Sequence, residues 1–101
     1  NAYAVCQRPE EGLLAGLWEF PNQLGNLTEA EAIQQASAWG CKPVAIEKTV
    51  RKTHIFTHIE WQMFGVYLEC EAMPERFVWK TVQELETEIT LPTAFRMFWN
   101  A

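Results

Sequence analysis

The sequence predicts an α+β fold in which a mixed or antiparallel β-sheet packs with helices. Three observations support this fold class: the order of the predicted elements, two capping boxes that each begin a helix, and a strand-rich segment over residues 43–70. The elements follow one another as β-β-α-β-β-β-α-α. With 101 residues, of which 49% are hydrophobic, the chain can build one modest core, so we expect a single domain over residues 1–101.

The first segment predicts two strands joined by a turn. Residues 3–8 have a strand pattern, and pairing should stop in the turn at residues 8–12, because Pro9 lacks a donor and Gly12 permits a positive φ. Residues 13–20 are apolar, and their second half is typical of a buried strand that ends at Pro21.

A capping box predicts where the first helix begins. Thr28 should accept a hydrogen bond from the Glu31 amide while the Glu31 carboxylate reaches back to Thr28. The helix is then expected from Glu29 to Trp39, with Gly40 as its C-terminal stop. Its apolar stripe, which should face inward, consists of Ala32, Ile33, Ala36 and Trp39.

Strand signals dominate residues 43–70, and helix signals return after them. Residues 44–50 belong to one strand region and residues 55–68 to one or two longer strands; a break near His58 would make a hairpin. Residues 77–79 predict a short strand. A second capping box, formed by Thr81 and Glu84, predicts a short helix that runs through Glu86. Leu91-Pro92 predicts the start of the last helix, whose core-packing face consists of Phe95, Phe98 and Trp99.

Charge and cysteine content limit the classes of function. The formal net charge is −5, whereas a free-standing DNA-binding protein usually carries the opposite sign. Lys48, Arg51 and Lys52 form a local basic group that either contacts phosphates or lies on a solvated strand edge. The three cysteines form no C-x-x-C pair, which favours a reducing compartment, and no segment resembles a membrane span or signal peptide. We therefore expect a cytoplasmic location. From the start at Asn1 without a methionine we expect a fragment of a larger protein, with processing as the alternative.

Residues 53–61, Thr-His-Ile-Phe-Thr-His-Ile-Glu-Trp, concentrate polar and aromatic chemistry in a strand-like run. If the run were extended, His54 and His58 would stand about 13 Å apart, at a rise of ~3.3 Å per residue, too far for one zinc ion to bridge. If the chain turns at residues 57–58, the ring, hydroxyl and imidazole converge. A planar, hydrogen-bonding ligand then fits better than a metal.

The candidate binding residues are His54, Phe56, Thr57 and His58. Each has an ordinary structural alternative. Phe56 would more often be a core residue than a base-stacking wedge, and a lone strand histidine such as His54 is often structural or solvated. Thr57 and His58 are the strongest candidates, because they interrupt an apolar strand. The residues more typical of core than of stacking platforms are Trp18, Trp61 and Trp79.

Two motifs together resemble the C-terminal domain of the MutY family of adenine DNA glycosylases. The first is Arg8-Pro9 followed by Gly-Leu-Leu-Ala-Gly-Leu-Trp-Glu-Phe-Pro over residues 12–21. The second is residues 54–58 with Trp61 a little later, which resemble the F-S-H motif of that domain. Phe56, Thr57 and His58 occupy the F-S-H positions, and Thr57 departs from the usual serine by adding a methyl group. The resemblance extends over nearly the whole chain.

This resemblance implies a Nudix-like fold and a role in base excision repair. The chain would be the C-terminal, lesion-recognition domain of a larger glycosylase, reading 8-oxoguanine opposite the adenine that the enzyme removes. The implied partners are double-stranded DNA with 8-oxoguanine:adenine mispairs and the protein's own N-terminal catalytic domain. That domain, rather than these residues, would hold a 4Fe–4S cluster and cleave the glycosidic bond. A bacterial, nucleoid-associated location would follow.

The same comparison argues against catalysis by this fragment. The Nudix pattern R-E-x-x-E-E-x-G should end on Gly40, yet residues 33–39 contain no carboxylate, and Glu29 and Glu31 lie at the expected helix start. We therefore expect no catalytic residue, no metal site and no cofactor in this chain. Two alternatives stay open: an independent Nudix hydrolase of nucleotide diphosphates, and a protein-interaction module built on a Nudix-like scaffold.

Overall fold

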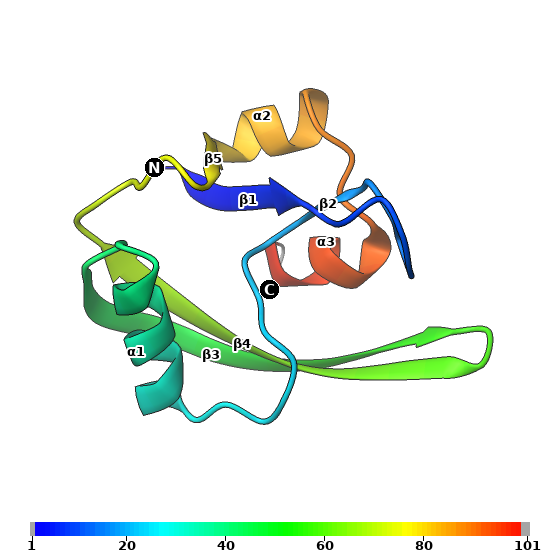
Figure 1. Cartoon of the computed structure of the whole chain (residues 1–101), viewed down its shortest axis with the longest axis horizontal. Coiled ribbons are helices and arrows are strands. Elements are labelled where there is room, and N and C mark those ends of the chain that lie inside the picture. Colours follow the sequence, from blue (N-terminus) through cyan, green and yellow to red (C-terminus); the bar gives the residue numbers. More distant parts are fainter. Residues whose placement is uncertain (1, 100–101) are drawn as a thin grey trace. The chain divides into compact units, whose positions relative to one another are not determined.

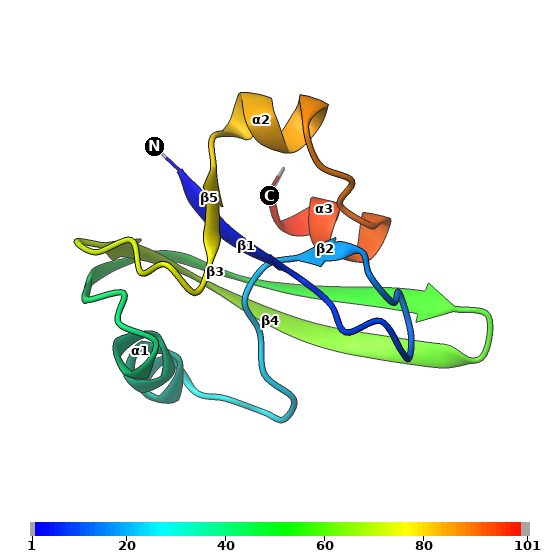
Figure 2. The ribbon, with the colours of Figure 1, turned by 45° about the horizontal axis from the view of Figure 1, so that its top comes forward.

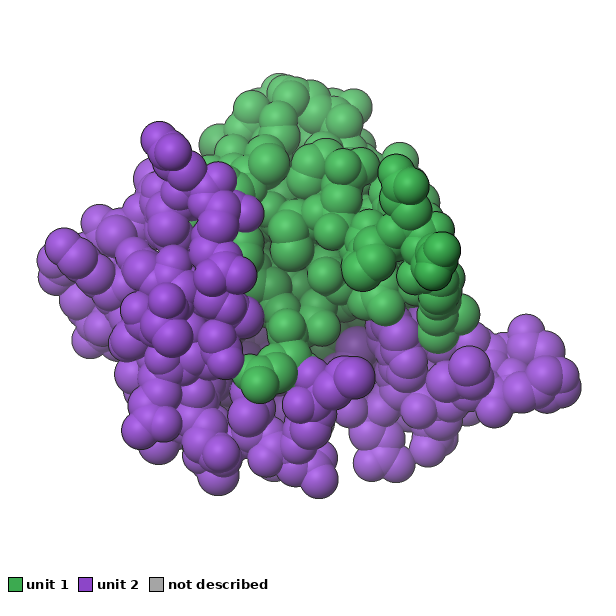
Figure 3. All heavy atoms as spheres, in the orientation of Figure 1, with its two compact units in different colours: residues 1–23, 77–100 green, residues 24–76, 101 purple. Residues whose placement is uncertain are grey.

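The computed structural model of the chain describes residues 2–99. Eight elements follow in the order β-β-α-β-β-β-α-α, and every strand pairing is antiparallel, which confirms the α+β class. The chain divides into two compact units (Figure 3), and each is described by itself. Within the described residues, unit 1 consists of residues 2–23 and 77–99, and unit 2 of residues 24–76.

Unit 1 contains a three-stranded sheet in the order β2-β1-β5. The central strand β1 (Tyr3–Gln7) pairs with β2 (Trp18–Glu19) on one side and with β5 (Val78–Lys80) on the other. The prediction of a buried strand in the second half of residues 13–20 is wrong in extent and burial. Only two residues pair there, and both are half-buried, because a turn occupies residues 13–16.

The loop between β1 and β2 is organised by Arg8. Its backbone N–H donates to the Leu17 carbonyl at 2.8 Å, and its Nε donates to the Leu13 carbonyl at 3.0 Å. Gly16 has φ 72° and donates from its N–H to the Pro9 carbonyl at 3.0 Å, a conformation that glycine adopts without a Cβ clash. This loop returns the chain to pair with β1.

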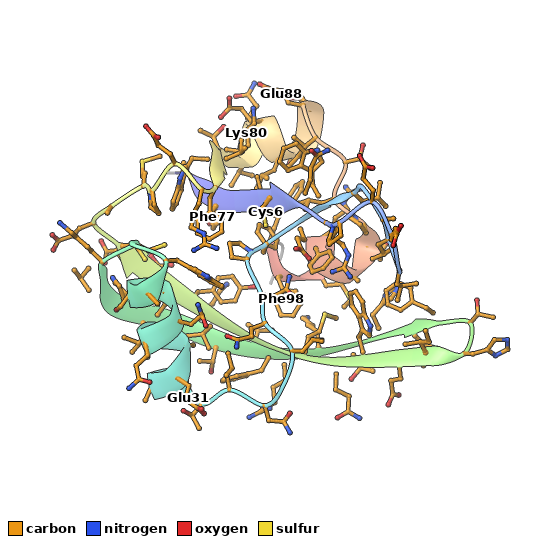
Figure 4. The ribbon with its side chains drawn as sticks, viewed as in Figure 1. Cys6, Glu31, Phe77, Lys80, Glu88 and Phe98 are labelled. Carbon is orange, nitrogen blue, oxygen red and sulfur yellow. The ribbon has the colours of Figure 1, made fainter. Side chains whose placement is uncertain are left out.

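Two short helices complete unit 1. Both halves of the predicted capping box are present at α2 (Val82–Thr87), where Thr81 Oγ1 accepts from the Glu84 N–H. Lys80 and Glu88 flank this helix and form an ion pair with 2.9 Å between Nζ and Oε1 (Figure 4). The last helix is α3 (Thr93–Trp99). The buried residues of unit 1 are Val5, Phe77, Leu85, Leu91, Ala94, Phe95 and Phe98.

The helix of unit 2, α1 (Glu29–Ala38), begins where the sequence predicts and ends one residue earlier, with Trp39 as its C-cap. Thr28 and Glu31 exchange both hydrogen bonds of a capping box, and Glu31 lies at the start of the helix (Figure 4). At the other end Gly40 has φ 89°, and the N–H groups of Gly40 and Cys41 donate to carbonyls of the last turn, at Ser37 and Ala36. These two bonds form a Schellman motif.

The hairpin of β3 (Pro43–Phe56) and β4 (Ile59–Cys70) is the largest element of unit 2. Register shifts occur between Pro43 and Ala45 and between Ile46 and Lys48, and the pairing is regular from Lys48 to the turn. Figures 1 and 2 both show a long twisted ribbon whose closed tip lies at the far end from α1. Of the two arrangements that the sequence leaves open, the structure has the break near His58. The predicted bounds are wrong, because residues 43–56 form one continuous strand and the second strand begins at Ile59. Among the described residues, no helix is long and apolar enough to cross a membrane.

Candidate nucleic-acid interface

The tip of the β3–β4 hairpin is a two-residue turn made of Thr57 and His58. Phe56 and Ile59 form the last strand pair, and both turn residues are exposed. Thr57 has φ 32°, which is uncommon for a β-branched residue. Two-residue hairpin turns need a positive φ at their first central position, and glycine is usual there in the type II′ form. The turn therefore places a hydroxyl and an imidazole at the outer end of the ribbon.

Three aromatic rings lie beside this turn on one face of the hairpin. The ring centroid of Phe56 lies 4.4 Å from that of His54 and 4.7 Å from that of Trp61, with interplanar angles of 68° and 67°. His54 lies on β3 and its cross-strand partner Trp61 lies on β4. The ring of Phe56 therefore contacts one ring from each strand. Edge-to-face contacts of this kind are a preferred arrangement of aromatic rings.

The strand register separates the hairpin into two faces of different chemistry. Because successive side chains alternate, each residue shares a face with its cross-strand partner. The pairs Lys48–Tyr67, Lys52–Met63, His54–Trp61 and Phe56–Ile59 lie on one face, the aromatic face. The pairs Arg51–Phe64, Thr53–Gln62 and Ile55–Glu60 lie on the other, the polar face. Within residues 48–63, the one carboxylate is that of Glu60, which lies on the polar face.

The three predicted phosphate contacts are divided between these faces. Lys48 and Lys52 lie on the aromatic face, and the Lys48 Nζ stands 4.7 Å from the centroid of the Tyr67 ring. Arg51 lies on the polar face, with its Cζ 4.4 Å from the centroid of the Phe64 ring. Such cation–π contacts restrain long side chains and leave the charge at the surface. The basic group is therefore not a single patch.

The four predicted binding residues all lie within the last three positions of the strand and the turn. His54 and Phe56 are in ring contact and half-buried, whereas Thr57 and His58 are exposed. The sequence pattern favours Trp61 as a core residue, whereas in the structure it is half-buried and its ring lies against that of Phe56. Counting outward from a two-residue turn at positions 57–58 would have paired Trp61 with His54.

Glu31, Cys41 and Cys70 lie in unit 2 outside the hairpin tip. The Glu31 carboxylate accepts a hydrogen bond from the Thr28 N–H at 3.0 Å, so it serves as a cap of α1. Burial raises the pKa of the thiols of Cys41 and Cys70, which keeps both in the neutral form near pH 7. Across residues 2–99, no three His, Cys, Asp or Glu side chains come close enough together to hold a metal ion.

Comparison with known proteins identifies the family of this chain. The profile of the NUDIX domain family matches residues 1–101. Adenine DNA glycosylase of Mus musculus is 30% identical over 93% of this chain, that of Homo sapiens 33% over 82%, and that of Arabidopsis thaliana 34% over 61%. The matched segments are 21%, 17% and 12% of those proteins, so the chain spans about a fifth of their length or less. The chain belongs to the NUDIX domain family, and it is similar to one segment of adenine DNA glycosylases.

Proposed function

We propose that this chain is the lesion-recognition domain of an adenine DNA glycosylase that removes adenine mispaired with 8-oxoguanine. The observation that carries the proposal is the exposed turn at the hairpin tip, which presents the Thr57 hydroxyl and the His58 imidazole side by side in the sequence. The similarity to adenine DNA glycosylases supports DNA as the partner. In this proposal the domain reads the oxidised base and does not itself cleave.

The chemistry of the lesion suits a hydroxyl at this position. 8-oxoguanine differs from guanine at two atoms of one edge: C8 gains a carbonyl, and N7 becomes a donor instead of an acceptor. The Thr57 hydroxyl both donates and accepts, so it can pair with either altered atom. Where the hydroxyl oxygen accepts from the N7 donor of the lesion, undamaged guanine presents an acceptor instead and leaves that oxygen unpaired, a mismatch that costs about 1–3 kcal/mol.

The aromatic face of the hairpin is the side on which we place the DNA strand. Near the tip this face carries His54 and Phe56, and further along it carries Lys48 and Lys52. The polar face carries Glu60, whose carboxylate accepts a hydrogen bond from Gln62 Nε2 at 3.2 Å and would repel phosphate. Phe56 keeps part of its ring exposed beside the turn and would stack against the neighbouring base.

Adenine excision belongs to another part of the protein in this proposal. The net charge of −5 gives the chain little affinity of its own for a duplex, so an N-terminal catalytic domain would hold most of the DNA. A 4Fe–4S cluster takes four cysteine ligands, and this chain has three cysteines, of which Cys6 stands in unit 1 and the other two in unit 2. The cluster therefore does not fit these residues and is assigned to the N-terminal domain. A nucleoid-associated, cytoplasmic location is part of the same proposal.

The test measures adenine excision by the complete gene product that contains this chain. Single-turnover rates are compared for adenine opposite 8-oxoguanine and adenine opposite guanine. Thr57→Val removes the hydroxyl and keeps the branched shape, and we expect it to lower the ratio of the two rates about ten-fold, the effect of one lost hydrogen bond. His58→Ala should lower the ratio in the same direction.

A matched control is available on the same strand. Thr53 is also exposed but lies on the polar face, so Thr53→Val should leave the ratio unchanged. If neither Thr57→Val nor His58→Ala changes the ratio, these side chains do not read the lesion. A gene product that lacks adenine excision altogether would favour a protein-interaction module on the same scaffold.

A further inference from the structure

The backbone of Thr57 is held in a conformation that its own side chain disfavours. Thr57 is the one residue of the 43–70 hairpin with a positive φ, and a second branch at Cβ crowds the backbone in this region. Neither turn residue is glycine or asparagine, which are the usual residues of such turns. A strained residue of this kind persists where the surrounding structure fixes it, and such residues gather at functional sites.

The ring cluster is the structure that adjoins this strained residue. Phe56 directly precedes Thr57, so the position of its ring is coupled to the direction in which the chain enters the turn. That ring is in edge-to-face contact with Trp61 at 4.7 Å and with His54 at 4.4 Å. Trp61 comes from the opposite strand, and the contact therefore ties the two strands together next to the turn.

We propose that Trp61 is a positioning residue for the lesion-reading turn. Through the ring of Phe56, the indole holds Thr57 in its left-handed conformation and so directs its hydroxyl. This inference rests on the proposed function, because it concerns the aim of the same hydroxyl. Trp61 itself does not contact the base.

A second aromatic residue on β4 separates positioning from general stabilisation. Phe64 lies on the polar face under the Arg51 guanidinium, with 4.4 Å between Cζ and the ring centroid. Phe64 and Trp61 are both half-buried, and the ring of each contacts a side chain of β3. Phe64 contacts Arg51, and Trp61 contacts Phe56. Phe64 is paired with Arg51, several strand pairs away from the turn. Its loss should therefore weaken the hairpin without changing the backbone conformation of Thr57.

The variants are compared in the complete gene product by the ratio of single-turnover rates on the two mispairs. Trp61→Val removes the ring and keeps a strand-forming residue, and we expect it to lower the ratio about ten-fold, which corresponds to about 1.4 kcal/mol. Trp61→Phe, which retains a ring, should restore most of the ratio. Phe64→Val should lower the thermal stability as Trp61→Val does and leave the ratio unchanged.

A second measurement follows the turn directly. In the isotope-labelled chain, the coupling between the amide and α protons of Thr57 reports φ, and it should move away from its left-handed value in Trp61→Val but not in Phe64→Val. The inference alone fails if Thr57→Val lowers the ratio while Trp61→Val leaves both the ratio and this coupling unchanged. It also fails if Trp61→Val does not fold, because a positioning role requires the hairpin to survive. If Thr57→Val itself has no effect, the proposed function fails first.

Discussion

The Nη1 atom of Arg8 lies 2.7 Å from Oε1 of Glu19, and this ion pair joins the end of β1 to β2. Glu19 Oε1 also accepts a hydrogen bond from Asn22 Nδ2 at 2.8 Å, and the Arg8 guanidinium lies 6.0 Å from the centroid of the Phe95 ring. The residues of the first motif therefore build a loop and fix its return to the sheet. Their part in the resemblance to adenine DNA glycosylases is structural.

Breaking this ion pair should destabilise unit 1. The side chains of Arg8 and Glu19 are 20% and 14% exposed, so removing one partner leaves a largely buried charge. We expect Glu19→Gln to lower the free energy of unfolding by about 1–3 kcal/mol, measured by urea denaturation. Arg8→Met should have an effect of similar size. If the loss in free energy of unfolding of the double variant equalled the sum of the two single losses, a direct interaction between the two side chains would be contradicted.

The strain at Thr57 predicts an unusual stabilising substitution. Asparagine tolerates a positive φ better than threonine, so Thr57→Asn should raise the free energy of unfolding by about 1 kcal/mol. Thr53→Asn serves as the control, because Thr53 lies within β3, where asparagine is a poor strand former; it should lower the stability. The two changes are compared by thermal unfolding. Equal losses of stability in both variants would show that Thr57 is not strained.

The capping box of α2 predicts a pH dependence of stability. A hydrogen bond from the Thr81 backbone N–H, with 2.9 Å to Oε1, lowers the pKa of Glu84 from its ordinary value of 4.5. A lowered pKa in the folded state means that the carboxylate stabilises the fold above pH 4.5 and that this contribution is lost as the pH falls through the folded value. Glu84→Gln lacks this titration.

The two proteins are compared by urea unfolding between neutral and acidic pH. The difference in free energy of unfolding between the parent chain and Glu84→Gln should be largest at neutral pH and shrink below pH 4.5. A difference that stays constant over the whole range would show that the Glu84 carboxylate makes no titrating contribution.

The burial of Cys41 predicts that it reacts slowly with alkylating agents. Only the thiolate is nucleophilic, and burial raises the pKa of both Cys41 and Cys70. At pH 8 we expect iodoacetamide to modify Cys41, which is 6% exposed, far more slowly in the folded chain than in urea. Mass spectrometry of timed samples measures this. Equal rates in the folded and unfolded chain would contradict the burial of Cys41.

Local signals account for the parts of the fold that the sequence predicts well. Both capping boxes form because each needs only residues three apart in the chain, Thr28 with Glu31 and Thr81 with Glu84. Gly40 ends α1 for an equally local reason, its positive φ. The turn at residues 57–58 follows from polar residues that interrupt a strand pattern. These features are set by residues close together in the sequence, so they depend little on the rest of the chain.

Other features depend on contacts that a strand pattern does not fix. The division of Lys48, Lys52 and Arg51 between two faces requires β3 to continue unbroken through residues 48–52, whereas the sequence pattern predicts a strand region that ends at residue 50. The left-handed backbone of Thr57 runs against its own propensity, and the tertiary context of the ring cluster decides it. The extent of β2 was missed because an apolar run does not distinguish a strand from a glycine-rich loop.

The most direct measurement is a chemical-shift titration of the isotope-labelled chain with two duplexes that differ only in 8-oxoguanine or guanine opposite adenine. We expect larger amide shifts with the damaged duplex, concentrated in residues 54–61 and greatest at Thr57 and His58. Phe64 and the other residues of the polar face should shift little. Identical shifts with both duplexes, or shifts confined to unit 1, would contradict a lesion reader at the hairpin tip.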